Sequence, residues 1–469
     1  MDRFMRESDA FTWYLEGDPV LRSIVVAAQW LDSAPDWDYL VERVDRATAS
    51  VPGFRQRLLE PPARLAVPRW AGDPEFDLSW HLRRMAAPLP RDDSVVLDVA
   101  RKDAMTGFDQ VRPLWQFTLI EGLEGGRAAL VMKMHHSLTD GVGAMELAFR
   151  LFDRDRDPGP LTDEPPPPGE RLGTLDVIRE HAGFRLAQSA GLAGRALRGA
   201  YPTAVGTLRH PWSRARQATA MAASVGRTVA PLFDTRSPIM KGRGLGRQLG
   251  FVEVGLSELQ AASRAAGGTI NDGFVAAVAG GLRIYHERHG APVDNLRLMM
   301  PINLRMPGDP AGGNRITLMR LEVPVGQKDV AGRVLEIGRR CRAVRHEMSL
   351  PHTNAIAGGL NLLPPSVVGS IFKHVDFIAS NVPGFDQPIY LAGAKVDREV
   401  AFGPTTGTAV NLTLVSYCGT CTVGVTADTA AIPDLDLLVE CLRAGFDEIL
   451  AAGAKRRPVK VGAGQPQEP

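Results

Sequence analysis

Apolar residues recur along this chain with two different periods, and segments of the two periods alternate. Short, mostly apolar runs predict strands at 23–31, 116–120 and 128–134. Helical spacing of apolar residues predicts helices at 39–47 and 95–105. In the remaining chain we predict strands at 76–82, 250–254, 296–300, 316–323, 377–380, 395–402 and 410–417, and helices at 142–151, 273–285, 330–348 and 435–450. This alternation indicates an α/β fold with mixed sheets.

The chain is too long for one hydrophobic core, and its composition marks where it divides. At 469 residues it exceeds the roughly 250–300 residues at which single cores stop growing, so we expect two domains. A proline-rich stretch, 158–168, ends in Pro165-Pro166-Pro167-Pro168 and predicts a stiff, exposed linker. We therefore assign 1–160 to an N-terminal domain, 161–236 to a linker with basic helices, 237–454 to a C-terminal domain and 455–469 to a disordered tail.

The segment 181–233 is basic along its whole length, with seven arginines and no aspartate or glutamate. Helical periodicity runs through it, with expected breaks at 199–202 and at Pro211. A basic amphipathic helix can lie on an anionic membrane surface. The alternative is that these helices pack on the two domains and turn their arginines to water, and the sequence leaves both readings open. The arginines are Arg185, Arg195, Arg198, Arg209, Arg214, Arg216 and Arg227.

Charge and cysteine content exclude several classes of function. A formal charge of +1 gives no global reason to expect nucleic acid as a partner. The first residues do not resemble a secretory signal, and no window supplies the roughly 20 apolar residues of a membrane span. Cys418-Gly419-Thr420-Cys421 is a single C-x-x-C pattern between strand-like runs, so we interpret it as a hairpin turn without metal or redox function. We expect a cytoplasmic protein, with peripheral contact to the inner membrane face or lipid droplets as an option.

The stretch His135-His136-Ser137-Leu138-Thr139-Asp140-Gly141 lies where the strand 128–134 ends and the helix 142–151 begins. Adjacent strand residues point to opposite faces, so we expect one histidine to be catalytic and the other structural. A neutral imidazole, with an unperturbed pKa of about 6.5, is suited to take a proton from a hydroxyl. Asp140 either orients the histidine or holds the loop through an arginine. Gly141, after it, can adopt backbone angles that other residues resist.

The spacing His-His-x-x-x-Asp-Gly resembles the active-site signature of the chloramphenicol-acetyltransferase-like acyltransferases. In that superfamily the second histidine is the general base and the aspartate is mainly structural. The resemblance therefore implies that His136 is the base and that Asp140 is structural, with His135 as the other candidate of the catalytic pair.

Further blocks, in the same order along 6–450, resemble the bacterial wax ester synthase/diacylglycerol acyltransferase family. They are Ser8-Asp9 through Trp13 with Glu16, Pro113-Leu114-Trp115, Thr269-Ile270-Asn271-Asp272, Pro301-Ile302-Asn303-Leu304-Arg305 with Gly313-Asn314, and Ser380-Asn381-Val382-Pro383-Gly384. Peptide condensation domains share the catalytic signature, whereas the Pro-Leu-Trp and Asn-Asp blocks make the match specific. The resemblance implies two similar chloramphenicol-acetyltransferase-like domains that flank a central tunnel. His136 would lie near its middle, with acyl-CoA and an alcohol entering from opposite sides.

The residues in and around the Asn-Asp block can be interpreted either as structural or as functional. Ser257 is the expected N-cap of a helix that ends at Gly267-Gly268. Capping alone explains Asn271, while the functional reading is that its amide, or the positive helix end, faces a developing oxyanion. Asp272 fits a cap or salt bridge better than a base. Arg305 either holds CoA phosphates or pairs with Asp140. The expected substrate-binding residues are Gly141, Asp272 and Arg305.

Together these features predict acyl-CoA-dependent O-acyl transfer through a ternary complex, without cofactor, metal or covalent enzyme intermediate. The expected acceptor is diacylglycerol, giving triacylglycerol, or a long-chain alcohol, giving a wax ester. A general base is insensitive to what carries the hydroxyl, so the motif does not choose between them. The alternatives are an acyltransferase for another lipid, a stand-alone condensation-type domain that takes its donor from a carrier protein, and a lipid-binding protein without turnover.

Overall fold

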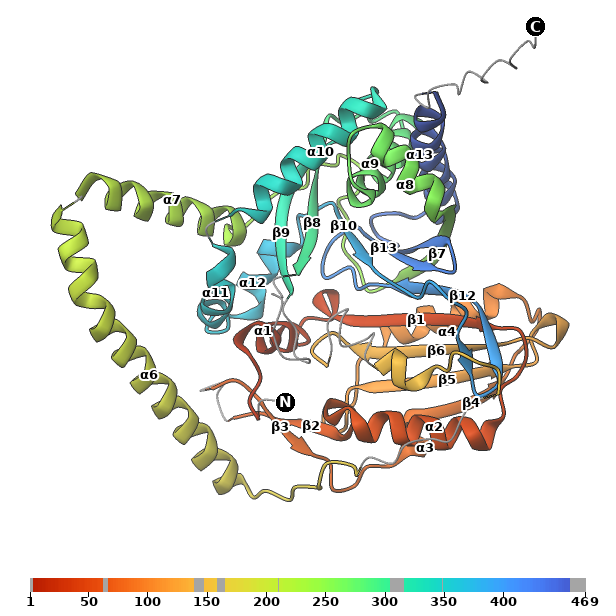
Figure 1. Cartoon of the computed structure of the whole chain (residues 1–469), viewed down its shortest axis with the longest axis horizontal. Helices are drawn as coiled ribbons and strands as arrows, with labels where there is room; N and C mark the ends of the chain where they lie inside the picture. Colours follow the sequence, from red (N-terminus) through yellow and green to blue (C-terminus); the bar gives the residue numbers. More distant parts are fainter. Residues whose placement is uncertain are drawn as a thin grey trace, which may run out of the picture.

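The computed structural model describes residues 3–61, 66–138, 147–157, 165–209, 211–303, 316–347 and 349–455. Its body consists of two six-stranded sheets with helices packed on them, which confirms the predicted mixed α/β class (Figure 1). A small two-stranded sheet pairs β2 (Gln56–Leu59) with β3 (Arg69–Gly72).

The first sheet contains the strand that leads to the two histidines. Its order is β11 (Tyr390–Leu391), β12 (Ala394–Phe402), β1 (Ile24–Leu31), β6 (Ala128–His135), β5 (Trp115–Glu121) and β4 (Leu82–Ala86). β1 and β6 are antiparallel and place Ile24 opposite His135. The apolar residues of α2 (Trp37–Ser50) join the core on one face, and those of α4 (Asp93–Met105) join the core on the other.

The second sheet forms the core of the C-terminal half. Its order is β7 (Arg247–Gly255), β14 (Thr420–Asp428), β13 (Val410–Tyr417), β10 (Phe377–Val382), β8 (Asn295–Asn303) and β9 (Ile316–Pro324). Its core also takes apolar residues from α8 (Leu256–Ala265), α9 (Ile270–Arg288), α10 (Val330–Arg345) and α13 (Leu435–Lys455). Because α4 contacts β7 as well as β1 and β6, it lies between the two sheets.

The two sheets do not divide the chain at one point, and the expected C-terminal domain of 237–454 stays a prediction. Within that range, β12 pairs with β1 of the first sheet and places Phe402 opposite Val26. The strand itself was predicted at 395–402, but its partner was not. Local periodicity predicts a strand, whereas the register that selects its neighbour depends on tertiary packing.

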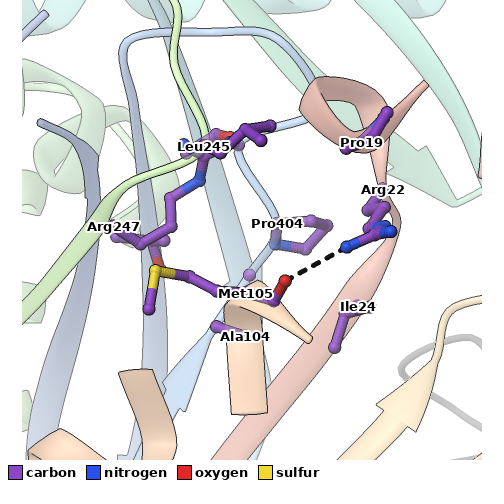
Figure 2. A pocket seen from close by; sticks show the side chains of 11 residues that line it. Pro19, Arg22, Ile24, Ala104, Met105, Leu245, Arg247 and Pro404 are labelled. Carbon is purple, nitrogen blue, oxygen red and sulfur yellow. Dashed lines mark hydrogen bonds between the residues drawn. The ribbon is translucent and has the colours of Figure 1, made fainter. Parts of the chain in front are cut away.

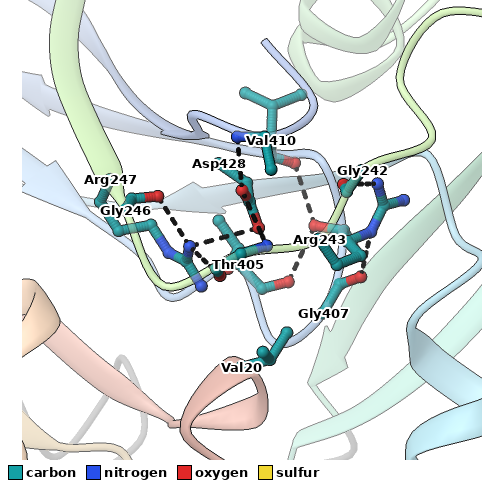
Figure 3. Close-up of polar contacts among 12 residues, drawn as sticks. Val20, Gly242, Arg243, Gly246, Arg247, Thr405, Gly407, Val410 and Asp428 are labelled. Carbon is teal, nitrogen blue, oxygen red and sulfur yellow. Dashed lines mark hydrogen bonds and ion pairs between the residues drawn. The ribbon is translucent and has the colours of Figure 1, made fainter. Parts of the chain in front are cut away.

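After β12 the chain returns to the second sheet through 403–409, and Arg243 holds this loop (Figure 3). The guanidinium of Arg243 donates to the carbonyl oxygens of Gly407 (2.6 Å), Val375 (3.0 Å) and Met240 (2.9 Å). Burial lowers its pKa, although Asp428 and Asp376 act in the opposite direction. One side chain thus ties the crossing loop to the second domain.

Asp428 completes this network at the end of β14 (Figure 3). Its buried carboxylate accepts hydrogen bonds from the amides of Gly244 (2.9 Å) and Ala430 (3.0 Å), and it pairs with Arg247 at 3.2 Å. A Cβ atom at Gly242 would lie 2.1 Å from the carbonyl oxygen of Ala430, so this approach requires glycine. The network is a polar lock at the end of the second sheet.

Two consecutive helices form a long arm that leaves the body and returns to it (Figure 1). α6 (Thr174–Arg209) is continuous, so the break expected at 199–202 is wrong. α7 (Pro211–Val229) begins at the predicted break, Pro211. Over the residues that the structure describes, no helix combines the length and the apolar character needed to cross a membrane.

Each end of the arm is fixed to a different part of the body. At its base, the buried Arg69 pairs with Glu170 at 2.6 Å and with Glu180 at 2.8 Å. Near its far end, the hydroxyl of Ser224 donates to the carboxylate of Glu347 at 2.5 Å. The arm therefore bridges the two halves of the chain.

Local capping explains two further differences from the predicted elements. The predicted strand 76–82 is wrong over most of its length, because Asp77 accepts from the amide of Ser79 (2.9 Å) and starts the short helix α3 (Leu78–His81). Ser257 is not an N-cap, since α8 begins at Leu256 with Gly255 before it. The helices α1 (Glu7–Leu15), α11 (Thr353–Leu360) and α12 (Pro365–Phe372) were not predicted.

The C-x-x-C stretch forms the predicted hairpin turn between β13 and β14. Cys418 and Gly419 occupy the turn with φ values of 46° and 83°. Cys418 is exposed and Cys421 is buried, so the two thiols lie in different environments. The predicted linker at 158–168 and tail at 455–469 fall largely outside the described residues.

Candidate active site

His135 is the last residue of β6 and His136 follows it, and residues next to the neighbouring strands hold their backbone amides. The amide of His135 donates to the carbonyl oxygen of Leu114 (3.0 Å), directly before β5. The amide of His136 donates to the carbonyl oxygen of Ser23 (2.9 Å), directly before β1. Three chain segments therefore fix the backbone of the pair, which is the rigidity that a catalytic side chain needs.

The ring of His135 is fully buried, and both of its nitrogens are engaged. The amide of Ser137 donates to Nδ1 at 3.1 Å, so Nδ1 carries the lone pair and Nε2 carries the ring proton. Nε2 then donates to Oε1 of Glu16 at 3.2 Å. The Trp13 ring packs edge-on against it, with the ring centroids 5.7 Å apart. In this arrangement neither nitrogen is left to accept a proton from a substrate.

Glu16 is the acceptor at the centre of this group, and its side chain is 6% exposed. Burial by itself raises the pKa of the Glu16 carboxyl. The pKa is nevertheless lowered overall, because His135, the amide of Ser23 and Arg22 stabilise the carboxylate. The amide of Ser23 donates to Oε1 at 2.7 Å, while its carbonyl oxygen accepts from His136. Glu16 thus supports the ring of one histidine and the backbone of the other.

His136 is half-buried in the turn that follows β6. The structure describes this turn as far as Leu138. Asp140 and Gly141 fall in 139–146, and Arg305 falls in 304–315, both outside the described residues. Their predicted roles therefore stay predictions.

A pocket of about 460 Å³, open solvent included, lies at the seam between the two sheets (Figure 2). Arg22 and Ile24, on either side of Ser23, line it from the first sheet. Met105 at the end of α4 and Arg247 at the start of β7 line it from the other side. Arg22 donates to the carbonyl oxygen of Met105 at 3.1 Å. Through Ser23, this pocket adjoins the backbone that holds His136.

At the start of α9 the structure separates the two residues of the Asn-Asp block. Thr269 is the N-cap, and the carboxylate of Asp272 accepts from its amide (2.8 Å) and its hydroxyl (2.9 Å). This capping box confirms the interpretation of Asp272 as a cap. Asn271 is not the cap, because Thr269 is the N-cap and Asn271 is the second residue of the helix; its Nδ2 lies 3.9 Å from the sulfur of Met300. The capping explanation of Asn271 is therefore wrong, and its oxyanion role stays a prediction.

Sequence reasoning missed a buried charge two residues before His135. Lys133 is almost fully buried, with its Nζ 4.5 Å from the centroid of the Phe108 ring. Burial lowers the pKa of Lys133 to about 8, although Asp103 acts in the opposite direction. Burial also raises the pKa of Asp103. The available signal was a lysine within an otherwise apolar strand.

Two family models and several similar proteins match almost the whole chain. Residues 5–274 match the family model of the wax ester synthase/diacylglycerol acyltransferase catalytic domain, and 312–450 match the C-terminal domain of that family. A Mycobacterium tuberculosis protein named "Putative diacyglycerol O-acyltransferase" is 37% identical over 446 residues, which cover 94% of this chain and 91% of that protein. A second protein of that name from the same species is 29% identical over 469 residues, covering 95% and 96%.

Solved structures share the fold. A wax ester synthase/diacylglycerol acyltransferase from Marinobacter aquaeolei superposes with a TM-score of 0.62 at 24% identity, covering 96% of this chain and 100% of that one. The first condensation domain of the CDA synthetase superposes with a TM-score of 0.58 at 15% identity, covering 96% of each. Both likenesses show the two-sheet architecture described above.

Proposed function

Because the chain belongs to the wax ester synthase/diacylglycerol acyltransferase family, and is thus an acyltransferase, we propose that it transfers an acyl group from acyl-CoA to a lipid hydroxyl. The acceptor that we favour is diacylglycerol, with triacylglycerol as the product. A long-chain alcohol, giving a wax ester, is the second acceptor class. Diacylglycerol is the acceptor in the names of the similar proteins, and the family name adds wax ester synthesis, which uses a long-chain alcohol.

The observation that carries the catalytic assignment is the state of His135. Its two nitrogens are held by Ser137 and Glu16, which leaves His136 as the histidine for proton transfer. His136 removes the proton from the acceptor hydroxyl, and that oxygen attacks the thioester carbonyl carbon. The tetrahedral intermediate collapses with cleavage of the C–S bond, and His136 returns its proton to the CoA thiolate. The products are the ester and CoA.

Asn271 is our candidate donor for the negative oxygen of the intermediate. It is the second residue of α9, where unpaired backbone amides and the positive end of the helix also favour an anion. Among the described residues, the hydrogen bond of its side-chain amide goes to a sulfur, a weak acceptor, so reorientation toward a stronger acceptor costs little. The roles of Asp140, Gly141 and Arg305 stay predictions.

The test is acceptor-dependent release of CoA by the purified protein. Palmitoyl-CoA is supplied with dioleoylglycerol or with hexadecanol, and free thiol is measured. Release that depends on one acceptor would support the proposal and identify the preferred alcohol. Release with neither acceptor, together with turnover of a carrier-bound acyl donor, would favour a condensation-type reaction instead.

The arm is our candidate for peripheral contact with an anionic lipid surface, where lipid acceptors reside. Its 181–233 segment carries only positive charges, and Trp212 at the start of α7 is 82% exposed. Tryptophan and arginine both favour the membrane interface. Flotation with phosphatidylglycerol vesicles at low salt tests this contact. Neutralising Arg195, Arg198, Arg214 and Arg216 should reduce flotation, and unchanged flotation would contradict the contact.

A further inference from the structure

The turn between α11 and α12 is apolar, exposed and uncharged. Between positions 349 and 372 the chain has no aspartate, glutamate, lysine or arginine, and most of this stretch folds into these two short helices. At the turn, Leu362 is 73% exposed, Leu363 is 41% exposed and Val367, in the first turn of α12, is 45% exposed. A single exposed leucine is ordinary, but several apolar side chains at one uncharged turn indicate a contact surface.

The end of the arm brings a further apolar side chain to α12. The amide of Leu232 donates to the carbonyl oxygen of Ser370 at 3.0 Å, so the chain returns from the arm beside this helix (Figure 1). Ser370 lies one helical turn after Val367, and its hydroxyl donates to the carbonyl oxygen of Val367 at 2.6 Å. The next residue of the arm, Phe233, is 87% exposed. We call Leu362, Leu363, Val367 and Phe233 the apolar patch.

The arm places charge of one sign next to this patch. Its segment 181–233, which ends at Phe233, has seven arginines and no acidic residue. Interfaces between proteins normally surround an apolar centre with a polar rim, and the uncharged stretch 349–372 does not supply a charged one. An anionic lipid surface instead favours apolar side chains flanked by positive charge. The partner that fits the patch is therefore a lipid surface.

The other side of the two helices packs on α1, the helix that precedes Glu16. The ring of Phe372 contacts that of Phe11 in α1, with the centroids 5.9 Å apart. The side-chain amide of Asn361 donates to the carboxylate of Glu7, also in α1, at 3.0 Å. Buried apolar residues of α1 and α12 belong to one hydrophobic cluster. The apolar patch is thus firmly attached to the body.

We propose that the apolar patch inserts into the surface of an anionic lipid phase while the arginines of the arm bind the headgroups. This proposal deepens the contact assigned to the arm, and it rests on the proposed function only for the view that the acceptor is a lipid. Arginines alone hold a protein at the headgroups, whereas inserted leucine and phenylalanine side chains add a contact that salt does not screen. Docking in this way would keep the protein at the phase that contains its acceptor.

Vesicle flotation at about 0.5 M NaCl tests the patch by itself, because this salt screens the arginines. With vesicles of phosphatidylcholine and phosphatidylglycerol, the wild type should still float. Leu362→Ser combined with Phe233→Ser should lower the ratio of bound to free protein at least about tenfold, since the inserted apolar area is lost. The control is Leu89→Ser, at a leucine 84% exposed in the turn between β4 and α4, which should change nothing. No flotation of the wild type in this salt, or equal flotation of the double variant, would overturn the insertion.

A fluorescent label measures insertion without requiring turnover. In a Cys418→Ser background, which removes the exposed thiol, a nitrobenzoxadiazole dye is attached at Leu362→Cys or at Leu89→Cys. Vesicles should shift the emission to the blue at position 362 and not at 89. That result would support the insertion even if no acyl transfer is found. No shift at 362, or a shift that needs only a second copy of the protein and no vesicles, would overturn it even if acyl transfer is established.

Discussion

At the scale of single residues, the two adjacent histidines lie in different environments. The ring of His135 is buried and both of its nitrogens form hydrogen bonds, whereas His136 lies in the turn after β6. Strand alternation predicted that the two side chains would differ in this way, but it could not predict their partners. Glu16 lies 119 residues away from His135 along the chain, so only the folded structure identifies it as the acceptor.

Two substitutions at Glu16 distinguish the effect of its charge on kcat from the effect of its hydrogen bonds. Glu16→Gln keeps an acceptor for His135 and for the amide of Ser23, so we expect kcat to fall by less than about tenfold. Glu16→Ala leaves two buried donors unsatisfied, at about 1–3 kcal/mol each. The segment that holds His136 would then shift, and we expect kcat to fall about 100-fold. Equal kcat values for the Ala variant and the wild type would show that Glu16 does not position the site.

Lys133 predicts a measurable dependence of stability on pH. Its folded pKa of about 8 lies below the ordinary value of 10.5. Between these values the unfolded chain binds more protons, so stability should rise as pH increases from about 8 to about 10.5. Lys133→Met should flatten the change in Tm across this window. Lys102→Met, an exposed control, should not, and equal slopes for the Lys133 variant and the wild type would contradict the assignment.

At the scale of elements, predictions succeeded where burial shapes the local pattern. β1, β5, β6 and β13 are mostly buried, and their apolar runs were sufficient to predict each of them as a strand. The prediction at 76–82 failed because Asp77 caps a helix inside an alternating pattern. The partner of β12 could not be predicted from any local feature. Likewise, α11 and α12 lack a side-chain cap and were missed.

The capping box of α9 gives a test of whether Asp272 also contacts substrate. Asp272→Asn weakens the reciprocal cap, and we expect a loss of about 1 kcal/mol in the free energy of unfolding. If Asp272 only caps the helix, the KM for both substrates should be unchanged in this variant. Asp329→Asn makes the same chemical change at the N-cap of α10 and is the control. A rise in KM for Asp272→Asn alone would return Asp272 to the substrate-binding residues.

At the scale of the whole molecule, a strand and the arm both join the halves of the chain. β12 crosses into the first sheet, and the arm is anchored at both ends. The polar lock around Arg243 and Asp428 fixes the returning loop beside the seam pocket, because Arg247 belongs to both. Packing between the halves thus determines the geometry of the site as much as either sheet does.

The polar lock around Arg243 and Asp428 should contribute strongly to the free energy of unfolding of the whole chain. Asp428→Asn removes a fully buried charge from Arg247 and weakens two hydrogen bonds from backbone amides. Breaking a buried ion pair costs about 3–5 kcal/mol. We expect a loss in that range in chemical denaturation. Glu440→Gln, which breaks an exposed pair with Arg288, should change the free energy of unfolding far less, because solvent screens that pair. Similar losses for both variants would contradict the lock.

The central claim is that His136 is the general base of an acyltransferase. The most direct measurement compares the turnover of His136→Ala with that of the wild type, with Tm and acyl-CoA affinity measured on the same samples. We predict that kcat falls by about 100- to 10,000-fold while Tm and affinity are retained. Turnover within a few-fold of the wild type, with substrate binding intact, would contradict the claim.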